Sequence, residues 1–209
     1  MKIKICGITR LEDALAAVDC GADALGFIFV PDSPRYVRPP AVQEITSQLP
    51  PEVITVGVFV NEPRGTIVRT IREAGIRAVQ LHGDESPEEA AGFGVRVMKG
   101  YRVTPGFDTA QLSAYHVYAH LLDAYVRGRR GGTGQTFDWQ VAFRARTFGK
   151  IVLSGGLQAE NVADAIRAAR PDAVDVSSGV ERTPGVKDHE KMKAFVVAAR
   201  EAFASVQTP

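Results

Sequence analysis

Two side chains that could move protons stand at the ends of apolar, strand-like runs. Cys6 closes KIKIC at residues 2–6, and Asp123 closes VYAHLLD at residues 117–123. A thiol and a carboxyl group that face one cavity suit general acid–base catalysis, in which one group takes a proton while the other gives one. Asp123 alone could equally cap a helix. The pair therefore predicts proton transfer on condition that the fold brings both strand ends to one rim.

Two glycine-containing turns indicate a phosphate site. Gly155 and Gly156 follow KIVLS, and Ser178 and Gly179 follow AVDVS. Glycines allow a sharp backbone turn with exposed amides, and the start of a following helix adds partial positive charge. Any strand-to-helix loop can need a glycine, so one such turn would be a weak signal. Two turns in consecutive units predict that the ligand is a small phosphorylated metabolite.

Arg35 and His82 also follow predicted strands. Arg35 lies in FVPDSPRYVRP (29–39) between two proline-stiffened turns, which would hold its guanidinium ready for a carboxylate. An ordinary surface arginine is the alternative. His82 follows RAVQL (77–81) and is expected to line the pocket, either as a functional group or as a structurally satisfied histidine. Further along, RGRRGGTGQTFDW (127–139) suggests either a mobile loop that closes over an anion or a solvated surface loop.

These residues are spaced along a repeating pattern of strands and helices. Eight units in 209 residues leave roughly 26 residues for each, close to one strand–loop–helix unit. Runs this apolar suit parallel strands buried on both faces, and eight such units with right-handed crossovers close most simply into a (βα)8 barrel. The expected strands are residues 2–6, 23–29, 53–59, 77–81, 95–100, 117–123, 150–154 and 173–177.

The predicted fold is therefore a compact α/β TIM barrel, with its chemistry at the carboxyl ends of the strands. An open, doubly wound sheet is the alternative, but no GxGxxG motif follows the first strand. The chain is shorter than the roughly 250 residues typical of the barrel, so DTAQLSAY (108–115) is expected to form an abbreviated or irregular fifth helix. No Pro- or Ser-rich linker divides the chain, so residues 1–209 are expected to form a single catalytic domain.

A closed barrel also predicts a buried ion pair. Lys4 lies two residues before Cys6, so both side chains point into the barrel, and Asp175 lies two residues before Ser177 and points inward by the same rule. The first and eighth strands are neighbours in a closed barrel. Because an unpaired interior lysine would be costly, we expect Lys4 and Asp175 to pair beneath the site.

The composition narrows the class of protein. Apolar residues make up 45% of the chain and the formal net charge is +1, so nothing favours nucleic acid or a membrane surface as a partner. No apolar run approaches the roughly 18 residues that span a bilayer, and the first residues show no signal-like apolar region, so a cytoplasmic protein is expected. The two cysteines cannot build a disulfide framework or a complete zinc site.

Seven segments together resemble one enzyme family. KICGIT, FVPDSPRYV, VQLHGDE, LLDA, GGTGQTFDW, LSGGLQAENV and VDVSSGVE occur in the order and spacing found in phosphoribosylanthranilate isomerases of tryptophan biosynthesis. The resemblance implies a (βα)8 barrel and an Amadori rearrangement of N-(5-phosphoribosyl)anthranilate to 1-(2-carboxyphenylamino)-1-deoxyribulose 5-phosphate. It implies no metal and no other cofactor. The sequence leaves open whether the protein is a monomer or a homodimer.

The resemblance also implies a role for each candidate residue. It places the general base at Cys6, the general acid at Asp123 and the grip on the anthranilate carboxylate at Arg35. The phosphate contacts fall on the turns Gly155–Gly156 and Ser178–Gly179. Asp123 would protonate the furanose ring oxygen as the ring opens to an iminium. Cys6, as thiolate, would then remove the C2 proton to give an enolamine, which tautomerises to the ketose.

Other functions remain open at this point. An isomerase for the analogous histidine-pathway intermediate would resemble a pair of catalytic aspartates on strands 1 and 5, whereas strand 1 here offers Cys6. An indole-glycerol-phosphate synthase would need a catalytic lysine at a strand end, for which Lys99 is the only candidate. A non-catalytic binding or assembly barrel is disfavoured because the base, the acid, the carboxylate grip and the phosphate turns are all intact.

Overall fold

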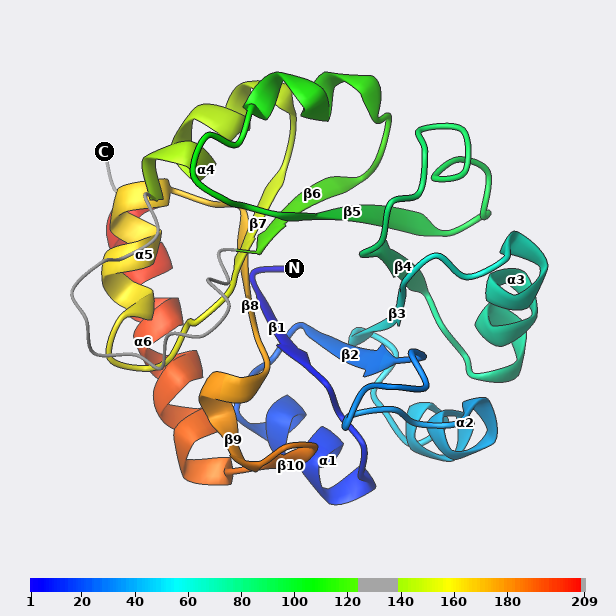
Figure 1. Cartoon of the computed structure of the whole chain (residues 1–209). Helices are drawn as coiled ribbons and strands as arrows, with labels where there is room; N and C mark the ends of the chain where they lie inside the picture. The colour runs from blue at the N-terminus through cyan, green and yellow to red at the C-terminus, as the bar shows by residue number, and fades with distance from the viewer. Residues whose placement is uncertain (124–138, 208–209) are drawn as a thin grey trace.

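Eight parallel strands form a closed barrel, as the sequence predicts. The computed structural model describes residues 1–123 and 139–207. Each strand pairs with the next along the chain, and β1 pairs with β8 to close the ring, which helices surround (Figure 1). The strands are β1 (Ile3–Cys6), β2 (Ala24–Ile28), β3 (Ile54–Phe59), β4 (Ala78–Leu81), β5 (Arg96–Arg102), β6 (Ala119–Asp123), β7 (Ile151–Ser154) and β8 (Ala173–Val176).

The helices are not distributed evenly around the ring. Between β5 and β6 the chain forms only a six-residue 3-10 helix, η1 (Thr109–Ala114), which confirms the abbreviated fifth unit. The described segment 82–95, between β4 and β5, contains turns and no α-helix, so the fourth unit is shortened as well. The α-helices of the described residues are α1 (Leu11–Asp19), α2 (Pro39–Thr46), α3 (Arg64–Glu73), α4 (Trp139–Ala145), α5 (Val162–Ala169) and α6 (His189–Gln207).

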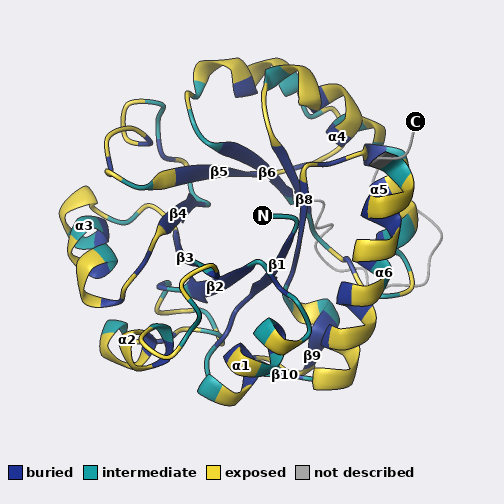
Figure 2. Ribbon diagram, turned by 180° about the vertical axis from the view of Figure 1, so that it is seen from behind, coloured by how far each residue is buried: buried dark blue, intermediate teal, exposed yellow. Residues whose placement is uncertain are grey.

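The barrel strands are buried on both faces (Figure 2). One apolar cluster fills the space between strands and helices, and a second fills the barrel interior. Met1 packs against the interior cluster and so covers its amino-terminal end. Nearer the carboxyl ends of the strands the interior becomes polar, because Lys4, Gln80 and Asp175 are buried there. The interior apolar cluster consists of Ala24, Val56, Ala78, Met98, Ala119, Leu121, Val152 and Ala173.

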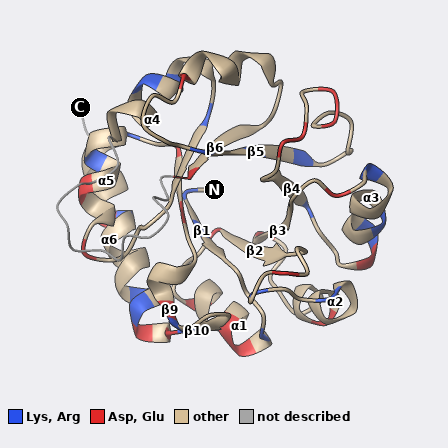
Figure 3. Ribbon diagram, viewed as in Figure 1, with Lys and Arg blue, Asp and Glu red and all other residues tan. Residues whose placement is uncertain are grey.

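Charged residues of both signs are spread over the helices and loops (Figure 3). This mixture agrees with the formal net charge of +1. None of the described helices has the length and hydropathy that crossing a bilayer requires. Surface charge therefore does not single out a site, which has to be sought at the strand ends.

A small hairpin that the sequence analysis did not predict follows the barrel. After β8 come a single 3-10 turn, η3 (Ser178–Val180), and two antiparallel strands, β9 (Glu181–Thr183) and β10 (Val186–Lys187). The Lys187 ammonium donates to the carbonyl oxygen of Cys6 at 2.6 Å. The hairpin thus returns the chain to the carboxyl end of β1 before α6 begins.

Candidate active site

Cys6 points into the barrel at the end of β1, opposite a glycine of the neighbouring strand. Its side chain is buried, and Gly26 of β2 is its partner in the register. A Cβ on Gly26 would stand 2.7 Å from Cys6 Sγ and 3.1 Å from Lys4 Nζ. Real Cβ atoms essentially never approach other atoms as closely as the first of these distances. A glycine is therefore required here for the thiol and the ammonium to share this part of the interior.

The predicted ion pair beneath Cys6 is confirmed. Lys4 Nζ lies 2.7 Å from Asp175 Oδ1, and the β1–β8 register sets the two residues directly opposite each other. The hydroxyl of Ser154 donates to the other Asp175 carboxylate oxygen at 3.1 Å. Burial works against a charged Lys4, but the Asp175 carboxylate and the ionised form of Cys6 outweigh it and raise the pKa of Lys4. The ammonium therefore stays charged below the thiol.

The same surroundings act on the thiol in opposite directions. Burial raises the pKa of Cys6, and the Lys4 ammonium is the largest opposing influence. The Asp175 carboxylate adds to the rise, while Lys187 lowers the pKa of Cys6. A thiolate at this position would therefore depend mainly on Lys4 for its stabilisation.

Asp123 ends β6 and lies beside His82, which follows β4. His82 Nε2 is 3.5 Å from Asp123 Oδ2, and both side chains are partly exposed. The amide nitrogen of Gln80 lies 3.0 Å from His82 Nδ1. When that amide donates to Nδ1, the proton of the neutral imidazole is on Nε2 and faces Asp123. A Cβ on Gly100 of β5 would overlap the His82 ring, so this glycine makes room for the arrangement.

Arg35 already holds a carboxylate, that of Glu181. Its Nε donates to Glu181 Oε1 at 2.8 Å, and its Nη2 donates to Glu181 Oε2 at 2.7 Å. The aliphatic stem crosses Gly7, where an added Cβ would stand 2.6 Å from Arg35 Cδ. The Arg35 side chain is 21% exposed and that of Glu181 only 5%. The fork geometry expected of Arg35 is present, and its occupant is a residue of the chain itself.

The two glycine turns lie against each other. Gly155 and Gly156 have φ angles of +88° and +65°, which favour glycine. The Asn161 side chain donates to the carbonyl oxygen of Gly156 at 3.0 Å and so fixes this turn at the start of α5. A Cβ on Gly179 would overlap the carbonyl oxygen of Leu157, so the turn after β8 packs directly on the turn after β7. The backbone of both turns can therefore converge on one phosphate group.

Lys99, the residue that an indole-glycerol-phosphate synthase would require, is engaged elsewhere. Its ammonium lies 3.1 Å from Glu85 Oε2 and donates to the carbonyl oxygen of Gly83 at 2.7 Å. Lys99 is buried, and its neighbour Met98 belongs to the interior cluster. Because successive strand residues point to opposite faces, Lys99 points out of the barrel interior. It therefore does not project into the site.

Several residues around the site were not predicted from the sequence, and one predicted loop lies outside the described residues. The loop expected at residues 127–139 lies outside the described residues except for Trp139, which begins α4. A glycine that makes room for a side chain of a neighbouring strand can be recognised only when the pairing register of the strands is known. The hairpin in VERTPGVKD was visible only as a polar turn. The residues missed are Gly26, Gln80, Gly100, Glu181 and Lys187.

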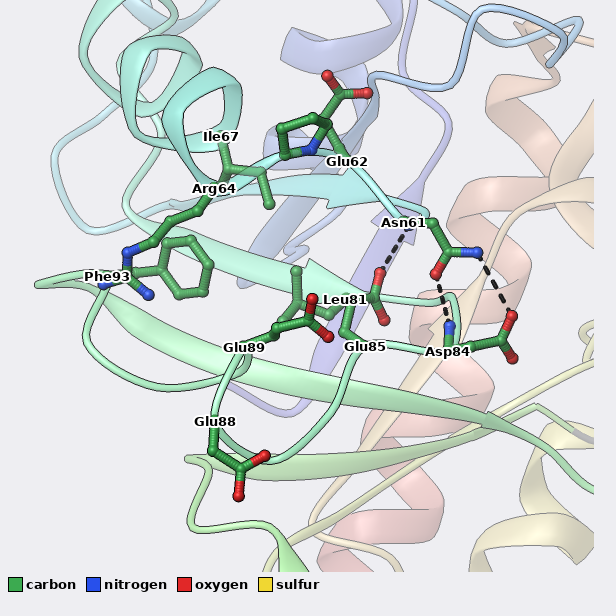
Figure 4. Close-up of a pocket in the computed structure, with 11 residues that line it drawn as sticks. Asn61, Glu62, Arg64, Ile67, Leu81, Asp84, Glu85, Glu88, Glu89 and Phe93 are labelled. Carbon is green, nitrogen blue, oxygen red and sulfur yellow. Dashed lines mark hydrogen bonds between the residues drawn. The ribbon is translucent and has the colours of Figure 1, made fainter.

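A separate cavity of about 660 Å³ lies between α3 and the segment after β4 (Figure 4). Its charged lining residues are five acidic side chains and one basic side chain, that of Arg64, which lies over the Phe93 ring. Such a lining would repel a phosphorylated anion. The cavity is therefore not the phosphate site. It is lined by Asn61, Glu62, Pro63, Arg64, Ile67, Leu81, Asp84, Glu85, Glu88, Glu89 and Phe93.

Comparison with known proteins gives the family. The family model of N-(5'phosphoribosyl)anthranilate (PRA) isomerase matches residues 3–198. The N-(5'-phosphoribosyl)anthranilate isomerase of Pelobacter propionicus is 51% identical over 201 residues, which cover 96% of each chain. That of Geobacter sp. (strain M21) is 52% identical over 200 residues, which cover 96% of this chain and 98% of the relative.

Solved structures agree with these sequence relationships. Phosphoribosyl anthranilate isomerase from Thermotoga maritima superposes with a TM-score of 0.90 at 45% identity, covering 96% of this chain and 99% of its own. A phosphoribosyl anthranilate isomerase in complex with reduced 1-(o-carboxyphenylamino)-1-deoxyribulose 5-phosphate gives a TM-score of 0.87 at 43% identity, with the same coverage. Sequence, fold and the geometry at the strand ends lead to one conclusion: the chain belongs to the phosphoribosylanthranilate isomerase family.

Proposed function

We propose that this chain catalyses the Amadori rearrangement of N-(5-phosphoribosyl)anthranilate to 1-(2-carboxyphenylamino)-1-deoxyribulose 5-phosphate in tryptophan biosynthesis. The observation that carries the proposal is the gathering of a thiol, a carboxyl group and two glycine turns at one end of the barrel. The strands β1, β6, β7 and β8 are parallel, so their carboxyl ends lie at the same end of the barrel. This end of the barrel carries Cys6, Asp123 and the two glycine turns. The names of the relatives support the same substrate.

The proposed chemistry consists of two proton transfers, one to the furanose ring oxygen and one from C2 of the substrate. Protonated Asp123 gives its proton to the furanose ring oxygen as the C1–O bond breaks, and the anilino nitrogen supplies the electron pair that forms a C1=N iminium. The Cys6 thiolate then takes the C2 proton, and the C2–H electron pair forms the C1=C2 bond of an enolamine. Tautomerisation moves the double bond to the C2 oxygen and gives the ketose. Electrons balance within the substrate, so no external oxidant or reductant takes part.

The remaining candidate residues are proposed to hold the substrate. Arg35 binds the anthranilate carboxylate, and the amides of Gly155–Gly156 and Ser178–Gly179 bind the phosphate. His82 lines the pocket and orients Asp123 through the 3.5 Å contact between them. Binding both anionic ends of the substrate would fix its ribose between the acid and the base.

One assay tests the function and the base separately. The fluorescence of freshly prepared N-(5-phosphoribosyl)anthranilate is followed with the purified wild type, with Cys6→Ala and with Cys20→Ala as the matched cysteine control. We expect turnover by the wild type and Cys20→Ala, and a loss of about 10²–10⁴-fold in Cys6→Ala. Turnover that survives in Cys6→Ala would keep the function and reject the base. An inactive wild type would reject the function and direct the search to the histidine-pathway substrate.

The setting of the enzyme is a further part of the proposal. We take residues 1–209 to act as one catalytic domain, in the cytoplasm, where phosphorylated biosynthetic intermediates are available. The domain works as a monomer or a homodimer; a relative from Thermotoga maritima is described as a dimeric isomerase from which monomers were generated. Light scattering coupled to size-exclusion chromatography distinguishes the two states.

A further inference from the structure

The hairpin after β8 carries a buried lysine that contacts three parts of the site. Lys187 is fully buried, and its ammonium donates to the carbonyl oxygens of Cys6 at 2.6 Å and Ser177 at 3.1 Å. It also donates to Glu181 Oε1 at 3.0 Å. All three partners are acceptors only, so Nζ needs three protons to satisfy them. Lys187 is therefore an ammonium ion in this arrangement.

Glu181 lies between two cations. Arg35 donates to its two oxygens through Nε and Nη2, and Lys187 and the backbone amide of Gly185 also donate to Oε1. A carboxylate held by so many donors and almost fully buried is fixed in place. Glu181 is thus a permanent partner of Arg35, and a role as a removable stand-in for the substrate does not fit these contacts.

The charges of this group do not cancel. Arg35 and Lys187 each contribute one positive charge and Glu181 contributes one negative charge, which leaves the group with a charge of +1. If Lys187 were absent, Arg35 and Glu181 would form a neutral pair with little attraction for another anion. The buried Lys187 therefore compensates for the negative charge of Glu181, so that the group around the partly buried Arg35 guanidinium keeps a net positive charge.

The geometry also fixes which edge of the guanidinium faces a ligand. Glu181 occupies Nε and Nη2, and no described residue bonds Nη1. Glycine at position 7 lets the arginine stem lie flat across the end of β1, beside Ser177. The group that results places the edge of Arg35 that carries Nη1 at the same end of the barrel as Cys6.

We infer that Glu181 and Lys187 are positioning residues that hold Arg35 for the carboxylate of the substrate. The inference rests on the proposed function and deepens it, because it assigns the ortho-carboxylate specificity of the site to the hairpin. Neither residue touches the reacting atoms. They help to bind a carboxylate that does not react, and this binding is equally strong in the ground state and the transition state. Loss of either residue therefore raises KM and leaves kcat nearly unchanged.

The test pairs a nearly isosteric variant with a truncated substrate. Wild type, Glu181→Gln and the control Glu12→Gln, which removes the Arg10 partner Glu12 on the exposed start of α1, are assayed on two compounds. One is N-(5-phosphoribosyl)anthranilate, and the other is N-(5-phosphoribosyl)aniline, which lacks the carboxylate. Thermal unfolding of each variant measures its folding. If Glu181→Gln fails to fold, Glu181→Asp replaces it, since it keeps the charge and shortens the reach.

We expect Glu181→Gln to raise KM for the anthranilate compound about tenfold or more, because the amide no longer holds the guanidinium through two charge-assisted hydrogen bonds and the lost orientation outweighs the added positive charge. Its kcat should stay within about threefold of wild type, as uniform binding requires. On the aniline compound Glu181→Gln and wild type should have the same kcat/KM, and Glu12→Gln should match wild type on both. An equal loss on both compounds would overturn the inference, because it would mean a structural role alone. A wild type that converts neither compound would reject the proposed function itself and, with it, the positioning role.

Discussion

Lys4 Nζ and Asp175 Oδ1 lie 2.7 Å apart in the barrel interior, although 171 residues separate them in the sequence. Neither side chain has more than 6% of its surface exposed. A pair so deeply buried constrains both partners, because removal of one leaves an uncompensated charge. Lys4 is also the cation that lowers the pKa of the Cys6 thiol most strongly.

Lys4→Met is expected to destabilise the fold strongly. The variant leaves the Asp175 carboxylate buried without its ammonium partner, which typically costs about 3–5 kcal/mol in the free energy of unfolding. Chemical denaturation of wild type and variant measures the difference. The double variant Lys4→Met/Asp175→Asn should recover a large part of the loss, since it removes the orphaned charge. If Lys4→Met changed neither stability nor turnover, the pair would have no role.

The same substitution should raise the pKa of the Cys6 thiol further. Burial already raises the pKa of Cys6, and Lys4 is the main influence that opposes burial. The thiolate absorbance of the Cys20→Ala protein, with the double variant Cys6→Ser/Cys20→Ala as the blank, gives the titration of Cys6 directly. The thiolate should appear above pH 9.0, the ordinary value, and at still higher pH in Lys4→Met. A titration unmoved by Lys4→Met would show that the ammonium does not act on the thiol.

Gly26→Ala should impair catalysis through one added methyl group. The new Cβ would stand 2.7 Å from Cys6 Sγ, so the thiol has to move. A displacement near 1 Å can cost about 100-fold in rate. The control is Gly65→Ala in α3, where nothing lies within 4 Å of the added Cβ. Gly65 lies in the first turn of α3, so this variant should keep both its activity and its stability. Equal turnover in both variants would argue against a base at Cys6.

Acid should weaken the hydrogen bond by which Asp13 of α1 holds the backbone amide of Lys187 in the hairpin. Burial alone would raise the pKa of Asp13, but hydrogen bonds from Arg10, the Lys187 amide and His189 outweigh it and hold the pKa below the ordinary 3.8. A folded-state pKa below the unfolded one stabilises the protein fully above pH 3.8, and this stability is lost as the pH falls through the folded value. The gap in unfolding free energy between wild type and Asp13→Asn should therefore be constant near neutrality and shrink below pH 4. Asp164→Asn, at an exposed pair on α5, should show no such trend. A gap for Asp13→Asn that stays constant down to pH 3 would contradict the assignment.

Strand order and side-chain alternation account for the part of the site that could be predicted from the sequence. The Lys4–Asp175 pair could be foreseen because closure of the barrel makes β1 and β8 neighbours and alternation points both side chains inward. The placement of Cys6 and Asp123 at one rim is a consequence of the same rules. The contact of Lys187 with the Cys6 carbonyl oxygen spans 181 residues and belongs to a hairpin outside the barrel, where no register rule applies. The bond between Arg35 and Glu181 could not be predicted for the same reason. The sequence therefore predicted that Arg35 binds a carboxylate but did not predict that Glu181 holds Arg35 in place.

The hairpin has a consequence for the order in which the protein folds. The bond from Lys187 to the carbonyl oxygen of Cys6 joins residues that are 181 positions apart. Contacts between such distant parts of a chain form late, because a long loop has to close before they can be made. The end of β1 therefore gains its bond to Lys187 later than its pairing with β2, which joins residues close in the sequence.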